Sequence, residues 1–209
     1  MNFVSFQGIL GAILVTREQL TDEQFSQLLD LKLTAVREVL SRLQPLVQSG
    51  HGKPYQVLHT SFTDFLCDPE RCGAMQWSID AAVHHCNMAS GCLQLMRQDL
   101  KFNICDIEIS YRRHIKIEGI QNRTDTRITP VLMYVCQYWA EHLESGSSTE
   151  PSSRCADEVM NFIESSPLYW IEMFSLKNPM SMISVILRTA ASWAKVAPTI
   201  ERDRCWLLT

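Results

Sequence analysis

The chain has 209 residues, of which 46% are hydrophobic and 20% are charged, and its formal net charge is −4. This is the composition of an ordinary globular protein with enough apolar residues for one or two cores, and it excludes a disordered chain. The small acidic excess gives no overall attraction to nucleic acid or to an anionic membrane, so charge alone does not identify a partner.

Eight cysteines are scattered through the sequence. A chain of this length and hydrophobicity needs no disulfide framework, so we expect buried thiols. The N-terminal residues Met1–Phe3 carry no basic segment of a signal peptide, and the apolar run from Ile9 to Val15 is too short to span a membrane. We therefore expect a cytoplasmic location and no membrane partner.

The first part of the chain predicts three short helices. Apolar residues recur at helical spacing from Phe6 to Ile13, where Gly8 and Gly11 either permit close packing or weaken the helix. A capping box at Thr21–Gln24 begins a second helix, and Thr34 is expected to cap a third. The second and third helices, joined by a tight link, predict a helix-turn-helix.

A β-hairpin is expected directly after these helices. Pro45 ends the third helix, and two strands, Leu46–Val47 and Tyr55–Leu58, flank a turn-rich loop at Gly50–Pro54. Three helices followed by a hairpin predict a winged-helix domain over residues 1–75.

The remainder of the chain, residues 76–209, is predicted to be all-α, so the whole protein is expected to be mainly α. Asp80 is expected to cap one helix. A capping residue followed by proline marks three later helix starts, at Thr129-Pro130, Ser166-Pro167 and Asn178-Pro179. We expect an irregular insert near 108–128 and a polar linker near 145–153.

The stretch from Val57 to Leu66 combines a strand end, a lone histidine and a helix start. Ser61 is expected to be the N-cap of this helix, with Asp64 as the capping-box acid. The aromatic residues Phe62 and Phe65 are expected to fix the helix against a core together with Leu66.

His59 is placed at the strand-to-helix turn of this stretch. There an imidazole and the backbone N–H groups of a helix start can together meet a phosphate. A hydrogen-bonded histidine with a purely structural role is the alternative interpretation.

No other pattern indicates catalysis or a metal. The sequence has neither the phosphate-binding pattern G-x-x-x-x-G-K-S/T nor a Rossmann glycine pattern. His84-His85-Cys86 with Cys92, or Cys67 with Cys72, lacks the spacing of a metal site, because adjacent histidines on a helix point to different sides. We therefore expect no enzyme activity, no metal site and no cofactor held by this chain alone.

A DNA-binding regulator is the alternative function, because winged helices often bind DNA. The segment from Arg17 to Thr60 has five basic and five acidic residues, and the would-be recognition helix contributes only Arg37 and Arg42. The basic segment Tyr111–Arg127 is expected to be a solvated loop. Nucleic acid is therefore the less favoured partner.

Several segments resemble one known family. The run His59-Thr60-Ser61-Phe62-Thr63-Asp64-Phe65-Leu66, continued by Cys67–Cys72, closely resembles the winged-helix segment of fungal NACHT proteins of the signal-transduction ATPase (STAND) class. Further segments are similar to the same proteins: Leu10–Ile13, Leu20–Glu23, Leu28-Leu29, Val39–Leu43, Asn103–Asp106 and Tyr134–Leu143. The resemblance covers roughly residues 5–195.

That family is related to animal NOD-like receptors and to fungal heterokaryon-incompatibility proteins. In it, an N-terminal effector and a NACHT ATPase module precede this region, and WD or other repeats commonly follow. The resemblance implies a non-catalytic regulatory and interaction fragment of such a switch, acting as a nucleotide-state-sensing lid and relay in fungal non-self recognition or programmed cell death. We expect a gene fragment, a truncated paralogue or an incomplete version of a longer gene.

The resemblance also implies a role for the histidine of the motif H-x-S-F-x-D/E-F, which in the family touches the bound nucleotide diphosphate and holds the closed, inactive state. The matching residue is His59, supported by Ser61, Phe62, Asp64 and Phe65. The implied partners are a NACHT ATPase module, in cis or in trans, and a WD-repeat sensor region. ADP or ATP would be bound only together with that ATPase module.

Overall fold

A computed structural model of the chain describes residues 3–48, 53–57, 59–72, 78–108, 118–146, 153–177 and 180–196. The described part is mainly helical and contains one two-stranded sheet, so the predicted mainly α class is confirmed. In chain order the elements are α1 (Phe3–Val15), α2 (Asp22–Leu28), α3 (Leu33–Leu43), β1 (Val47–Gln48), β2 (Gln56–Val57), α4 (Thr60–Cys67), α5 (Pro69–Cys72), α6 (Ala81–Asp99), α7 (Ile120–Arg127), α8 (Pro130–Ser145), α9 (Ser153–Ser165), α10 (Pro167–Lys177) and α11 (Ser181–Val196).

The capping box at the start of α2 is present as predicted. The Thr21 side chain accepts a hydrogen bond from the backbone N–H of Gln24, and the Gln24 side chain bonds the backbone N–H of Thr21. The prediction for α3 was wrong, because Lys32 is its N-cap and Thr34 lies inside its first turn. Helix α3 therefore begins without a side-chain cap.

The predicted hairpin is an antiparallel pair of two-residue strands. Val47 pairs with Val57, and Gln48 pairs with Gln56. Most of the expected turn and Leu58 lie outside the described residues. Three helices followed by two short strands is the order that the sequence predicted, while the winged-helix assignment itself stays a prediction.

Two of the predicted caps in the second part are present. The Asp80 carboxylate accepts hydrogen bonds from the first N–H groups of α6, and Thr129 accepts from the N–H of Leu132 at the start of α8. Helix α10 begins at Pro167 as expected. The Asn178-Pro179 pair lies outside the described residues.

Helix α7 lies within the segment near 108–128, so the prediction of an irregular insert was wrong for residues 120–127. Its sequence has little apolar periodicity. Asp125 pairs with Lys177 and Arg127 pairs with Asp106, so both ion pairs connect α7 to other segments. The linker predicted near 145–153 follows the end of α8 at Ser145 and precedes the start of α9 at Ser153, and most of it lies outside the described residues. The expected domain boundary at residue 75 lies outside the described residues.

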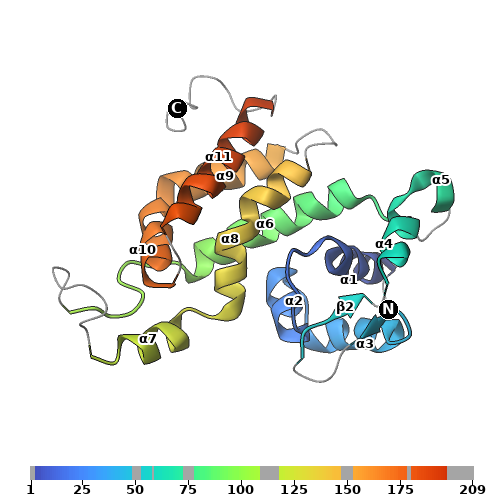
Figure 1. Cartoon of the computed structure of the whole chain (residues 1–209), viewed down its shortest axis with the longest axis horizontal. Coiled ribbons are helices and arrows are strands. Elements are labelled where there is room, and N and C mark those ends of the chain that lie inside the picture. Colours follow the sequence, from blue (N-terminus) through green and yellow to red (C-terminus); the bar gives the residue numbers. More distant parts are fainter. Residues whose placement is uncertain are drawn as a thin grey trace.

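Helices α6 and α8 pack against each other in the middle of the molecule (Figure 1). Helices α9, α10 and α11 lie on one side of this pair, and α1, α2 and α3 lie on the other (Figure 1). Trp139, Phe162 and Trp170 are buried together, and the Trp170 ring packs edge-on against both others. These aromatic residues therefore belong to the core.

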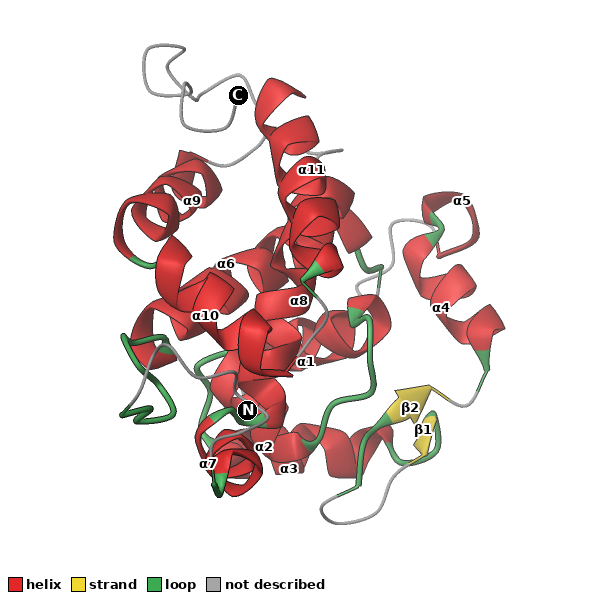
Figure 2. Cartoon of the chain, turned by 60° about the vertical axis from the view of Figure 1, so that its left-hand side comes forward, coloured by secondary structure: helices red, strands yellow, loops and turns green. Residues whose placement is uncertain are grey.

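The first helices approach α6 closely through glycines. A Cβ on Gly11 would lie 2.3 Å from the His84 ring, so this glycine of α1 serves close packing. Helices α4 and α5 lie to one side of the molecule, beyond the small sheet (Figure 2). No helix in the described ranges is both long and apolar enough to cross a lipid bilayer.

Candidate functional site

His59, the histidine singled out in the sequence, is the N-cap of α4. Its backbone is extended, with φ −147° and ψ 134°, and its ring accepts a hydrogen bond from the backbone N–H of Ser61. The prediction that Ser61 caps this helix was therefore wrong. Ser61 lies inside the first turn, and its hydroxyl contacts the histidine ring instead, with 2.6 Å between Oγ and Nδ1.

The hydrogen bond from the Ser61 backbone determines which nitrogen of the neutral His59 ring carries the hydrogen. The backbone N–H of Ser61 can only donate, and it lies 3.1 Å from Nδ1, so Nδ1 is the acceptor. The proton of the neutral imidazole is therefore on Nε2. Since His59 is exposed, the ring presents a donor at the beginning of a helix.

The other residues of the motif divide between core and solvent. Phe62 is partly buried and packs on the core, and Leu66 is only 4% exposed. Phe65 is 41% exposed, and Asp64 is also exposed, so the expectation that Phe65 helps to fix α4 was wrong. Among the described elements, α4 contacts mainly β2 and α5. The side of α4 that carries Asp64 and Phe65 is therefore exposed.

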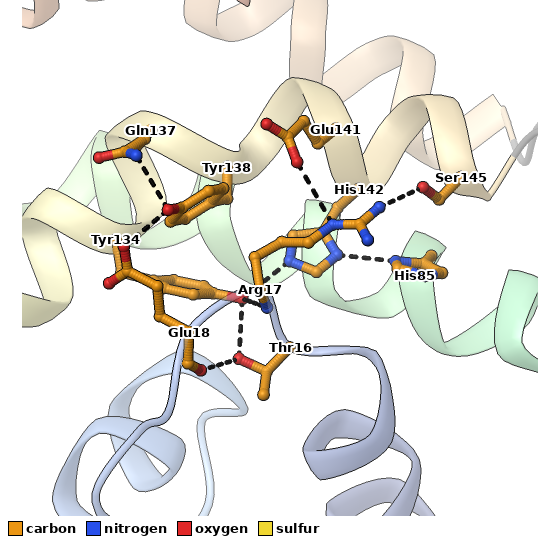
Figure 3. Close-up of polar contacts among 10 residues, drawn as sticks. All are labelled: Thr16, Arg17, Glu18, His85, Tyr134, Gln137, Tyr138, Glu141, His142 and Ser145. Atoms are coloured by element: carbon orange, nitrogen blue, oxygen red, sulfur yellow. Dashed lines mark hydrogen bonds and ion pairs between the residues drawn. The ribbon is translucent and has the colours of Figure 1, made fainter. Parts of the chain in front are cut away.

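A second polar cluster, which we call the polar joint, lies in the interior between α6, α8 and the loop that follows α1 (Figure 3). It is made of Thr16, Tyr134, His142 and His85. Three contacts connect them in series: 3.0 Å from Thr16 Oγ1 to Tyr134 Oη, 2.9 Å from Tyr134 Oη to His142 Nε2, and 2.9 Å between the Nδ1 atoms of His142 and His85. His142 is fully buried.

The loop between α1 and α2 is attached to α8 by further contacts of Arg17 and Glu18 (Figure 3). The Arg17 guanidinium donates to Ser145 Oγ at 2.6 Å and forms an ion pair with Glu141 at 3.4 Å. The Tyr138 hydroxyl donates to the Glu18 carboxylate at 2.6 Å. The polar joint and these neighbouring contacts together connect the loop after α1 to the long helix α8.

Burial determines the charge state of the polar joint. It lowers the pKa of His85, and the cation of Arg17 and the neighbouring His84 lower it further. It also lowers the pKa of His142, with added effects of His85 and Arg17. Burial raises the pKa of Tyr134. All three groups are consequently neutral at neutral pH.

Three of the described cysteines are buried thiols of low reactivity. Burial raises the pKa of Cys92, Cys105 and Cys136, which keeps them as protonated thiols of low reactivity. Within the described ranges, no three His, Cys, Asp or Glu side chains are grouped to hold a metal ion. His84 and His85 point to different neighbours, Gly11 and His142, as the helical spacing predicted.

A groove of about 290 Å³ lies between α1, the turn from α2 to α3, and α6. Its walls combine apolar and polar side chains. It is lined by Gly8, Ala12, Leu28, Leu29, Asp30, Leu31, His84, Asn87, Met88, Ser90, Gly91 and Gln94.

The two arginines of the would-be recognition helix are paired with acidic residues. Arg37 Nε lies 2.6 Å from an oxygen of Asp22, whose side chain is only 1% exposed, and the same guanidinium contacts Glu23 at 3.3 Å. Arg42 pairs with Glu38 at 3.0 Å. Their positive charge is therefore largely compensated on the protein itself.

Comparisons with protein-family models, with curated proteins and with solved structures give no match to this chain.

The polar joint was not predicted from the sequence. Its two histidines are 57 residues apart, and Thr16 is 118 residues from Tyr134, so no local pattern connects them. The available signal was on α8, where Tyr134 and His142 lie eight residues apart on a largely apolar helix face. A buried histidine and tyrosine at that spacing require polar partners.

Proposed function

We propose that this chain is a non-catalytic regulatory and interaction module, the nucleotide-state-sensing lid and relay of a NACHT-type signal-transduction ATPase. The observation that carries the proposal is His59: an exposed imidazole whose Nδ1 is occupied by Ser61, so that Nε2–H is the free donor of the ring. A donor at a helix start is suited to a phosphate oxygen of ADP.

A lid also needs a connection that transmits its motion. The polar joint supplies one, because Thr16 and Arg17 of the loop after α1 are bonded to α8, while α1 itself packs on α6. Loss of the contact between His59 and a phosphate would shift the lid relative to the ATPase module, and this connection would carry the shift to the helical part. The proposed setting is cytoplasmic, fungal non-self recognition or programmed cell death.

The alternative, a winged-helix DNA-binding regulator, is less favoured. A protein that reads DNA holds its register through several phosphate contacts from uncompensated cations. Here Arg37 and Arg42 already face Asp22, Glu23 and Glu38. Salt-dependent binding of a DNA duplex that is lost in the double variant R37A/R42A would favour the alternative over the lid.

The lid proposal is tested by a pull-down of this chain with a separately produced NACHT ATPase module from the same organism, in ADP and in ATP. We expect binding that is stronger in ADP and weakened by His59→Ala. His59→Asn separates the ligand contact from helix capping, since Asn is a good N-cap but places no donor where Nε2 lies. It is expected to weaken ADP-favoured binding as His59→Ala does.

Gln56→Ala is the matched control, because Gln56 is an exposed residue of the neighbouring strand β2. This variant is expected to bind as the wild type does. Equal binding of wild type and His59→Asn would show that only the cap matters, and absence of binding in both nucleotide states would contradict the lid.

A further inference from the structure

The donor and the acceptor of each hydrogen bond in the polar joint can be deduced in turn, beginning with Thr16. The hydroxyl of Thr16 has a single proton, which it donates to the carbonyl oxygen of Glu18 at 2.7 Å. In the 3.0 Å contact between Thr16 and Tyr134, the tyrosine must therefore be the donor. The backbone N–H of Arg17 donates to the same tyrosine oxygen at 3.2 Å.

The same reasoning assigns the two histidines. Because the Tyr134 proton is directed at Thr16, His142 Nε2 must carry the proton in its 2.9 Å contact with Tyr134. A neutral His142 then has a bare Nδ1, which can only accept. His85 must be the Nδ1–H tautomer, donating to His142 across the 2.9 Å contact.

Among the described residues, Arg17, His84 and the two rings themselves are the groups that act on the charge of the pair. Arg17, which pairs with Glu141 of α8, is the cation that acts on both rings. His84 acts on His85 from the same helix. Several other ionisable groups on the packed elements have partners of their own: Asp22 on α2 binds Arg37, Tyr138 on α8 binds Glu18, and Cys155 on α9 donates to the Cys86 carbonyl. Cys92 on α6 is a protonated thiol, and Arg188 and Lys195 on α11 are exposed.

The two possible protonation steps have different consequences. A first proton can add to His85 at Nε2, and every hydrogen bond of the joint is kept. A second proton must go to Nδ1 of His142, where it would face the Nδ1–H of His85 at 2.9 Å. Two donors and two positive charges at this distance repel each other, so the contact between α6 and α8 at this point breaks.

We infer that His85 and His142 form an acid-sensitive joint, closed when the pair is neutral or carries one added proton and opened by the second proton. Helix α1 packs on α6, while the loop that follows α1 is bonded to α8. Loss of the contact between His85 and His142 therefore acts at the junction between the first three helices and the helical part. The joint is independent of the proposed nucleotide contact at His59.

The tautomers are measurable on the whole chain by NMR of ¹⁵N-labelled imidazoles at pH 7, with assignment by single histidine variants. The expected result is a proton on Nδ1 of His85 and on Nε2 of His142, both rings neutral. Protonation of both rings on Nε2 alone, or an imidazolium at either position at pH 7, would overturn the inference.

His85→Asn tests the proton count. Its side-chain N–H group can take the place of Nδ1–H and donate to His142, but it binds no proton. Each proton linked to opening changes the opening equilibrium by about tenfold per pH unit. Below pH 6, where both rings of the opened state take up protons, the equilibrium constant of the wild type is expected to rise by up to about a hundredfold per unit, and that of His85→Asn by at most about tenfold.

His85→Ala is the comparison variant, because it removes both the charge and the donor. We expect it to be clearly less stable than His85→Asn at pH 7.5, since only the asparagine keeps the bond to His142. Equal stability of the two variants at pH 7.5 would overturn the donor assignment, and equal pH slopes of wild type and His85→Asn would overturn the two-proton opening. The NMR result on the wild type decides the inference even where a variant fails to fold.

Discussion

The carbonyl oxygen of Leu28 lies so close to Gly91 that a Cβ added to the glycine would be 2.3 Å away from it. Leu28 is the last residue of α2, and Gly91 lies in the middle of α6. The atom that would be met is a backbone oxygen, which cannot move aside as the end of a side chain does. The absence of a side chain at Gly91 is what lets the first helices pack on α6.

Gly91→Ala is therefore expected to destabilise the protein, although alanine is the better helix former. Overpacking costs about 1–3 kcal/mol, against a gain of up to about 1 kcal/mol from helix propensity. Gly8→Ala in α1 is the control, because a Cβ there meets nothing within 4 Å, and it is expected to stabilise by about 0.5–1 kcal/mol. Urea unfolding measures both changes, and stabilisation by Gly91→Ala would contradict the close approach.

The features that were predicted correctly from the sequence are local ones. Thr21 with Gln24, Asp80, and Thr129 with Pro130 each satisfy the N–H groups of a helix within three or four residues, so the pattern contains the whole interaction. The prediction that Ser61 is an N-cap was wrong because His59, two residues earlier, also has a side-chain acceptor. The helix begins directly after His59, so His59 takes the N-cap position.

The features that were missed depend on contacts between distant segments. Helix α7 has little apolar periodicity. Its residues Asp125 and Arg127 form ion pairs with residues outside the helix. Phe65 has helical spacing from Phe62, but the elements that the structure describes leave 41% of its surface exposed. The polar joint forms only where α6, α8 and the loop after α1 meet in the folded chain. No short sequence pattern contains residues from all three segments.

Tyr134→Phe is expected to be strongly destabilising, because the hydroxyl it removes is the centre of the polar joint. Its loss leaves the Arg17 backbone N–H and the Nε2–H of His142 without an acceptor. A buried donor left unsatisfied costs about 1–3 kcal/mol, and the His142 donor is fully buried, whereas Arg17 is exposed. A loss of about 1–3 kcal/mol in the free energy of unfolding is therefore expected.

Tyr138→Phe provides the comparison for this prediction. The Tyr138 hydroxyl is only partly buried, and its partners Glu18 and Gln137 can turn to water. Its removal is expected to cost less than about 1 kcal/mol. Thermal unfolding of the two variants side by side measures the difference, and equal losses would show that the joint has no special role.

Replacement of His59 is expected to loosen the start of α4 without unfolding the rest of the chain. His59→Ala removes the acceptor of the Ser61 N–H, and loss of an N-cap costs about 0.5–2 kcal/mol. His59→Asn is expected to keep most of that capping energy. Hydrogen exchange of the α4 amides measures the effect, which should be absent from α6. Unchanged exchange in His59→Ala would mean that the imidazole does not cap the helix in solution.

The stability of the whole chain is expected to fall as the pH is lowered from 7.5 to 5.5. Burial lowers the pKa of His84, His85 and His142 in the folded state below the ordinary value of 6.5. Below that value the unfolded chain binds more protons than the folded chain, so acid favours unfolding, and the stabilisation is fully present above pH 7.

His85 and His142 are each expected to contribute about 1 kcal/mol to this loss at pH 5.5. Carboxylates titrate mainly below pH 5, so the interval from 7.5 to 5.5 reports the histidines. The Asp125 carboxylate, whose pKa is lowered by the Lys177 hydrogen bond, acts only in more acidic solution. Urea midpoints measured across this interval test the prediction, and a constant or rising midpoint toward pH 5.5 would show that His85 and His142 are not buried as neutral rings.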